Sequence, residues 1–157
     1  ITVVGDLSTT LRTRIGKFYN ADIFMPSERE LRACFHDFES GISVLVNRLY
    51  QVSKIKEIFL SLADRGVMFF RRPPQGTYTM ETAHVPPLSE RCEDLMGIGD
   101  AFLVGVAMGR VCGAEEVQSM YLGAACSAIH GRQIGGGPLT RDAIHHLLDE
   151  RPELSRT

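Results

Sequence analysis

The chain has 157 residues, of which 44% are hydrophobic and 23% charged, a balance that predicts a packed core and excludes a disordered chain. Its formal net charge of −2 argues against nucleic acid as a partner, and no apolar run reaches the length of a membrane span, so no membrane partner is expected. The four cysteines have neither zinc-ligand nor redox spacing, which favours a reducing, cytoplasmic setting.

Short β-branched and aromatic runs predict the strands, and apolar residues at helical spacing predict the helices. The expected strands cover residues 1–4, 21–25, 55–62, 67–70 and 77–82. The expected helices cover residues 41–52, 101–111, 114–130 and 141–148, the last of them capped by Thr140, with one or two helical turns over 11–19. Strands and helices interleave, and antiparallel pairing is expected near residues 67–82, so the sequence predicts a layered α/β fold.

A further helix is expected to begin after Ser27, because Ser27 and Glu30 have the spacing of a capping box. In that arrangement the serine side chain accepts a hydrogen bond from the third helical N–H group, and the glutamate side chain reaches back to the serine N–H group. The apolar stripe of this helix would be Leu31, Phe35 and Phe38.

The segment 94–102 carries the strongest functional signal. Gly97 and Gly99 precede the apolar run 101–111, which is typical of a tight turn that leads into a buried helix. Free backbone N–H groups and the positive end of the helix dipole make such a start an anion site. Asp100 beside it makes chemical sense as a base next to a phosphoryl group in transfer. The alternative is structural: the glycines allow positive φ or close packing, and Asp100 caps the helix.

This segment resembles the C-terminal signature of the PfkB/ribokinase family of carbohydrate kinases, approximately Asp-Thr-x-Gly-Ala-Gly-Asp-Ala-Phe. The matching residues are Asp94, Gly97, Gly99, Asp100, Ala101 and Phe102. Leu95 replaces the threonine and Ile98 the small residue. The resemblance implies that the amides from Gly97 through Ile98 and Gly99 to Asp100 form an anion hole. It also implies that Asp100 is the catalytic base, that ATP and Mg²⁺ are the cofactors, and that the fold is a ribokinase-like, Rossmann-like layered α/β sandwich.

A second motif of the family is Pro-Asn-x-x-Glu, which helps to organise the magnesium–phosphate network. Pro26 and Glu30 match it, and Ser27 replaces the asparagine. The resemblance therefore implies an indirect metal role for Glu30. The capping box remains the alternative explanation of the same two side chains.

The family also supplies candidates for nucleotide binding. Ser61, Ala63 and Gly66 stand where family members have Thr-x-Gly-x-x-Gly, a loop that contacts the nucleotide phosphates through its backbone. Gly66 also suits an ordinary turn. Gly123 and Cys126 lie on the helix that lines the adenine pocket in the family, and core packing is the alternative for both.

The resemblance runs along nearly the whole chain but covers only the C-terminal half of a family member. It implies that residues 1–157 form the nucleotide-binding and catalytic half, and that the sugar-binding N-terminal half and the lid are absent. The opening strand without a methionine also indicates a piece of something longer or a trimmed chain. The expected partners are a sugar or nucleoside substrate, with the missing half or a second copy of the chain.

Two functions stay open. The first is phosphoryl transfer from ATP to a sugar or nucleoside hydroxyl, incomplete in this fragment alone. The second is a non-catalytic, nucleotide-binding or scaffold relative, because Ser27, Ala63, Leu95 and Ile98 depart from the family motifs. Ile98 would be strained if the turn needed a positive φ there. A Rossmann dinucleotide site is disfavoured, because its third glycine would fall at Phe102.

Overall fold

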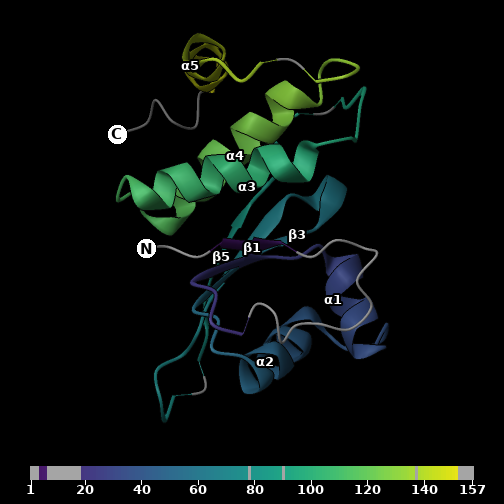
Figure 1. Cartoon of the computed structure of the whole chain (residues 1–157), viewed down its shortest axis with the longest axis vertical. Coiled ribbons are helices and arrows are strands. Elements are labelled where there is room, and N and C mark those ends of the chain that lie inside the picture. Colours follow the sequence, from purple (N-terminus) through teal and green to yellow (C-terminus); the bar gives the residue numbers. More distant parts are fainter. Residues whose placement is uncertain (1–3, 7–18, 78, 90, 137, 152–157) are drawn as a thin grey trace. The chain divides into compact units, whose positions relative to one another are not determined.

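The computed structural model describes residues 4–6, 19–77, 79–89, 91–136 and 138–151 (Figure 1). These residues form two compact units, Ile1–His84 and Val85–Thr157, which we describe one at a time. The helical turns expected over residues 11–19 lie outside the described residues except for Tyr19, which is in a turn. None of the helices in the described ranges is long and apolar enough to cross a membrane.

The first unit is built on a five-stranded sheet in the order β1-β2-β3-β4-β5. The strands are β1 Val4–Asp6, β2 Ile23–Met25, β3 Glu57–Ser61, β4 Val67–Arg71 and β5 Glu81–Val85. β1, β2 and β3 are parallel neighbours, with Val4 opposite Ile23 and Ile23 opposite Glu57. β3 and β4 form an antiparallel hairpin in which Ser61 faces Val67. The sheet therefore confirms the layered α/β fold with some antiparallel pairing.

The helices α1, Glu28–Phe35, and α2, Ile42–Val52, contribute side chains to the apolar core of this unit. The core combines strand and helix residues that are almost fully buried: Phe24, Leu31, Leu45, Val46, Leu49, Ile58, Leu60 and Phe70. Tyr50 is buried beside them, and its hydroxyl donates to the Phe70 carbonyl oxygen at 2.9 Å. This bond satisfies a polar atom that burial would otherwise leave without a partner.

Two expectations for the first unit are wrong. Phe38 does not continue the stripe of α1, because the helix ends at Phe35 and His36 adopts a left-handed conformation with φ of 50°; Phe38 is 68% exposed. The strand expected over 77–82 is instead β5, Glu81–Val85. Thr77 belongs to the preceding turn, since both its N–H group and its hydroxyl donate to the Pro74 carbonyl oxygen.

The described residues of the second unit form three helices, α3 Ile98–Val111, α4 Glu116–His130 and α5 Arg141–Asp149. Glycines let α3 and α4 approach closely: a Cβ at Gly105 would lie 2.7 Å from the Gly123 Cα, and one at Gly109 would lie 2.9 Å from the Ser119 Oγ. Thr140 caps α5 as expected, and its Oγ1 accepts from the Ala143 N–H group at 3.2 Å.

The expectation that α3 is buried all round is wrong. Its start is also three residues earlier than expected, at Ile98. The side that carries Val106 and the glycines is buried, whereas Val104, Met108 and Val111 are 45%, 60% and 70% exposed. An apolar sequence does not reveal which side a neighbouring helix covers, and here the small residues mark that side.

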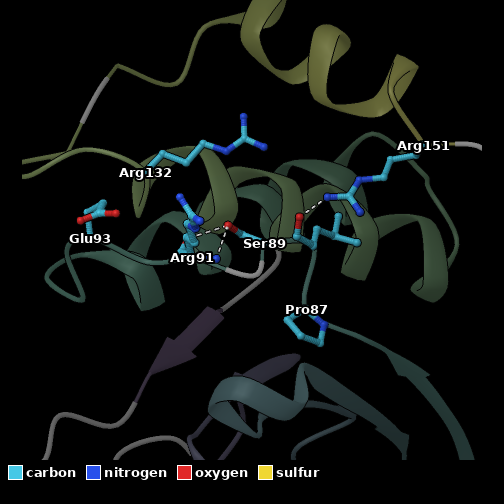
Figure 2. Close-up of a pocket in the computed structure, with 7 residues that line it drawn as sticks. Pro87, Ser89, Arg91, Glu93, Arg132 and Arg151 are labelled. Carbon is cyan, nitrogen blue, oxygen red and sulfur yellow. Dashed lines mark hydrogen bonds between the residues drawn. The ribbon is translucent and has the colours of Figure 1, made fainter.

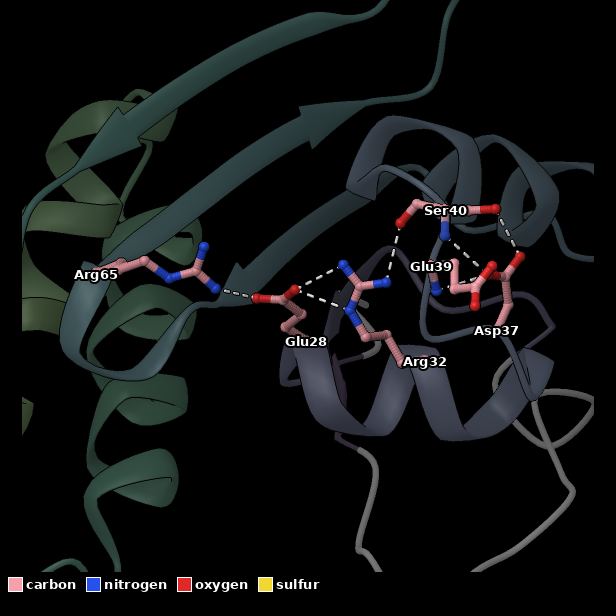
Figure 3. A network of polar contacts seen from close by, with 6 residues as sticks. All are labelled: Glu28, Arg32, Asp37, Glu39, Ser40 and Arg65. Carbon is pink, nitrogen blue, oxygen red and sulfur yellow. Dashed lines mark hydrogen bonds and ion pairs between the residues drawn. The ribbon is translucent and has the colours of Figure 1, made fainter.

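Asp37 provides a pH-dependent contribution to the stability of the first unit. Its carboxylate accepts from the N–H group and the hydroxyl of Ser40 at 2.9 and 2.8 Å (Figure 3). It also forms an ion pair with Arg48. The bonds from Ser40, above all, lower the pKa of Asp37 from 3.8 to about 2. Because the folded pKa is the lower one, this contribution is present above the unfolded pKa and is lost as the pH falls through about 2.

We therefore expect the Asp37→Asn variant to lose less stability than the parent chain as the pH falls between 3.8 and about 2. Urea unfolding at a series of pH values measures this. The matched control is Glu39→Gln, which removes a neighbouring carboxylate but leaves the bonds between Asp37 and Ser40 in place. Parallel pH profiles for Asp37→Asn and the parent chain would contradict the assignment.

Candidate functional site

The start of α3 presents backbone N–H groups that have no acceptor in the described part of the chain. Gly97 is the N-cap, with φ of 76°, and its carbonyl oxygen accepts from the Ala101 N–H group at 2.9 Å. The N–H groups of Ile98, Gly99 and Asp100 precede the first helical bond, and no acceptor in the described part of the chain contacts them. A Cβ at Gly99 would meet nothing within 4 Å. The turn therefore has the free donors and the open space that an anion needs.

The positive φ of this turn falls on Gly97 and not on Ile98, which lies in the helix. The strain considered for Ile98 is therefore absent. A side chain at Gly97 would be strained by the backbone conformation, and its Cβ would also lie 2.7 Å from the His130 Nε2. Two independent constraints thus require glycine at the N-cap.

Asp94 and His130 hold the turn in place. The Asp94 carboxylate accepts from the N–H groups of Gly135 and Met96 at 2.8 and 2.9 Å, and these bonds lower its pKa. His130 Nε2 donates to the Met96 carbonyl oxygen at 3.0 Å. Asp94 was predicted only as the opening residue of the motif, and His130 was missed. The signal for His130 is long-range contact, which local spacing does not contain.

Asp100 is exposed in the first turn of α3. It is not the helix cap, because Gly97 occupies that position and no side chain caps this helix. Among the described residues, no donor or cation contacts its carboxylate. A carboxylate in the same helical turn as the free amides can accept a proton from a hydroxyl that approaches an anion bound there.

In the first unit, the structure brings two predicted motifs together at the carboxyl ends of β2 and β3. Ser27 and Ser61 form a parallel bridge, and the Ser61 N–H group donates to the Pro26 carbonyl oxygen at 3.0 Å. Arg65 forms an ion pair with Glu28, which joins the loop after β3 to the start of α1 (Figure 3). Ligands of open α/β sheets commonly bind outside the carboxyl ends of parallel strands.

Glu30 is already engaged within this region. Its Oε2 accepts from the N–H group and the hydroxyl of Ser27 at 2.8 and 2.7 Å, and the Ser27 Oγ accepts from the Glu30 N–H group at 3.2 Å. The capping box is thus confirmed, and the metal role of Glu30 stays a prediction. Within the described ranges, no group of three His, Cys, Asp or Glu residues is placed to hold a metal ion.

In the loop between β3 and β4, Ala63 adopts a left-handed backbone conformation that normally favours glycine. Ala63 has φ of 56°, and Gly66 has φ of 86°. The loop is closed by bonds from the Leu62 N–H group to the Gly66 carbonyl oxygen and from the Gly66 N–H group to the Ala63 carbonyl oxygen, at 2.8 and 3.1 Å. An alanine in the left-handed region costs about 1–2 kcal/mol. The loop geometry is therefore retained at an energetic cost, while nucleotide contacts by Ser61, Ala63 and Gly66 stay a prediction.

Gly123 and Cys126 lie in α4 where this helix meets α3. Both are buried, and a Cβ at Gly123 would lie 2.7 Å from the Val106 Cγ2 and 2.9 Å from the Phe102 ring. Burial raises the pKa of the Cys126 thiol, as expected for a core cysteine. Helix packing fully explains these two residues, and their contact with adenine stays a prediction.

Comparison with known proteins agrees with these observations. The profile of the pfkB family carbohydrate kinases matches residues 8–142. No curated protein sequence matches the chain. Ribokinase from Thermotoga maritima is similar with a TM-score of 0.79 and 19% identity, over 95% of this chain and 49% of that one. The ribokinase of Arabidopsis thaliana, solved with ribose and ATP, gives 0.78 and 22%, over 96% and 48%.

Adenosine kinase from Sinorhizobium meliloti is similar with a TM-score of 0.75 and 20% identity, over 94% of this chain and 45% of that one. At such identities the likeness establishes the fold, a ribokinase-type α/β architecture. The chain spans about half the length of these solved kinases. The match to the family profile covers most of the sequence, and the chain therefore belongs to the pfkB family of carbohydrate kinases.

Proposed function

We propose that the chain is the nucleotide-binding and catalytic half of a kinase that transfers the γ-phosphoryl group of ATP to a hydroxyl of a sugar or nucleoside. The observation that carries the proposal is the start of α3. There the N–H groups of Ile98, Gly99 and Asp100 have no acceptor among the described residues, and no described residue contacts the Asp100 carboxylate in the same helical turn. The family supports the same reaction class.

In this proposal the amides bind the phosphoryl group, and Asp100 removes the proton of the attacking hydroxyl. Phosphoryl transfer depends mainly on positioning and on neutralisation of negative charge, which fixed backbone donors provide without reorganisation. Mg²⁺, when bound with ATP, neutralises phosphate charge. The Asp94 bonds to Met96 and Gly135 keep the donors in position.

The acceptor site belongs, in this proposal, to an N-terminal half that precedes the chain. The solved kinases are about twice as long as the part that matches. One of them was solved with ribose and another is an adenosine kinase, which supports sugars and nucleosides as the acceptor class. A cytoplasmic location and a second copy as partner stay predictions.

A non-catalytic, nucleotide-binding relative is the second candidate. Glu30 supports it, because its carboxylate is occupied by both donors of Ser27 where the family has an asparagine in the Ser27 position. The strained Ala63 supports it as well, since that loop has lost a glycine that its backbone conformation favours.

The test is phosphorylation by the complete polypeptide with radiolabelled ATP and a panel of acceptors that includes ribose and adenosine. We expect label in a phosphorylated sugar or nucleoside. Binding of ATP without transfer to any acceptor of the panel would contradict the kinase proposal and favour the second candidate.

A further inference from the structure

An open hollow in the second unit has no part in the proposed phosphoryl transfer. It has a volume of about 780 Å³ and is lined by Arg91, Arg132 and Arg151, by Glu93 and by the segment 87–89 (Figure 2). This volume lies in the range of small-molecule sites, roughly 300–1,000 Å³. Its lining is unusual for a ligand pocket, because charged side chains outnumber apolar ones.

The three arginines come from three separate segments. Arg91 precedes α3, Arg132 follows α4, and Arg151 follows α5. Figure 2 shows all three side chains around the same hollow, with Arg151 on the opposite side from Arg91 and Arg132. The fold, and not proximity in the sequence, therefore brings the three arginines together.

Backbone contacts fix the walls of the hollow. The guanidinium group of Arg151 donates to the Leu88 carbonyl oxygen. The Ser89 hydroxyl donates to the Arg91 carbonyl oxygen at 2.6 Å. The Glu93 N–H group donates to the Gly131 carbonyl oxygen at 2.7 Å, directly beside Arg132. Hydrogen bonds to backbone atoms thus hold the segments that carry the three arginines in place.

Positive charge outweighs negative charge among the described residues that line the hollow. Among the described residues that line it, three carry a guanidinium group and one, Glu93, carries a carboxylate. Among the described residues, no carboxylate forms an ion pair with any of these arginines. Like charges gathered in one hollow repel each other, and an anion with two or more negative charges relieves this repulsion. Guanidinium groups match phosphoryl oxygens in geometry as well as in charge.

We propose that this hollow binds a phosphorylated small molecule that also carries a hydroxyl group. The arginines contact the phosphoryl group, and the Glu93 carboxylate accepts a hydrogen bond from the hydroxyl. None of the residues 97–100 lines the hollow, and the proposal does not depend on the kinase activity. Sugar phosphates and nucleotides share this chemistry.

The experiment is calorimetric titration of the chain with pyrophosphate, methyl phosphate, ribose 5-phosphate and ATP as separate probes. We expect Arg91→Gln and Arg132→Gln each to weaken pyrophosphate binding about tenfold, the loss of one hydrogen bond to a charged group. Arg141→Gln is the matched control: it removes an exposed arginine of the same unit outside the hollow, and we expect it to leave binding unchanged.

Glu93→Gln tests the hydroxyl contact. We expect it to lower the affinity for ribose 5-phosphate relative to methyl phosphate, a phosphate monoester of the same charge that has no hydroxyl group on carbon. A neutral amide is a weaker acceptor for that hydroxyl group than the carboxylate is. Comparison of ribose 5-phosphate with ATP then distinguishes a sugar phosphate from a nucleotide as the preferred ligand. An equal effect of Glu93→Gln on ribose 5-phosphate and methyl phosphate would overturn the hydroxyl assignment.

Gly99→Val separates this proposal from the kinase proposal. We expect it to leave pyrophosphate binding at the hollow intact. If Gly99→Val abolishes all pyrophosphate binding while the two arginine variants bind normally, the anion sits at α3 and the hollow proposal is wrong. Absence of pyrophosphate binding by the folded parent chain would also overturn it.

Discussion

The Asp100→Asn variant of the complete polypeptide is expected to lower kcat by roughly a hundredfold to ten-thousandfold, the usual contribution of a general base. The amide keeps the size of the carboxylate but does not take a proton from the acceptor hydroxyl. Because Asp100 is unengaged and exposed, the exchange breaks no contact of the described structure. The affinity for ATP is therefore expected to stay close to normal. Steady-state kinetics, with nucleotide binding measured separately, check both parts.

Asp142→Asn is the matched control. Asp142 is an exposed aspartate in the first turn of α5, so it has the same charge and a similar helix position without the free amides proposed as an anion hole. We expect normal turnover from it. Normal turnover from Asp100→Asn as well would refute the assignment of Asp100 as the base.

The Gly105→Val variant is expected to destabilise the second unit by about 2–3 kcal/mol, a cost typical of overpacking. A Cβ at this position would lie 2.7 Å from the Gly123 Cα and 3.0 Å from the Cys126 Sγ. Since the nearest atom belongs to the backbone, relief requires α3 and α4 to move apart. Denaturant unfolding, followed by helical circular dichroism, measures the loss.

Gly99→Ala is the control on the same helix. Nothing lies within 4 Å of a Cβ there, so the methyl group meets open space. Alanine favours a helix more than glycine does, and we expect unchanged or slightly higher stability. If Gly105→Val unfolds at the same denaturant concentration as Gly99→Ala, the close helix approach at Gly105 does not exist.

Local features of this chain were predictable from the sequence. The Ser27–Glu30 capping box, the Thr140 cap and helix α2 depend on neighbours within one or two turns. The end of α1 and the position of β5 were not predictable. His36 leaves the helix through a left-handed backbone, and strand pairing is decided by residues distant in the sequence.

The candidate site likewise has one part that could be predicted from the sequence and another that could not. The Gly97–Asp100 turn was recognisable from residue spacing, and its free amides follow from the helix start. The role of His130 depends on a contact across 34 positions of sequence, and the bond from Gly135 to Asp94 spans 41. The arginine hollow combines three distant segments and has no linear motif at all.

Calorimetric titration of magnesium-ATP into the complete polypeptide, its Gly99→Val variant and a Gly41→Val control tests the central claim most directly. Gly41 is the N-cap of α2, whereas Gly99 lies in the first turn of α3, and a Cβ at either position meets nothing within 4 Å. The Gly41→Val variant therefore places the same side chain at the helix start of the other unit. We expect saturable binding by the parent and by Gly41→Val. We expect at least about tenfold weaker binding by Gly99→Val, because the side chain fills the space before the amides. Equal affinity of all three proteins would contradict the placement of the phosphates at the start of α3.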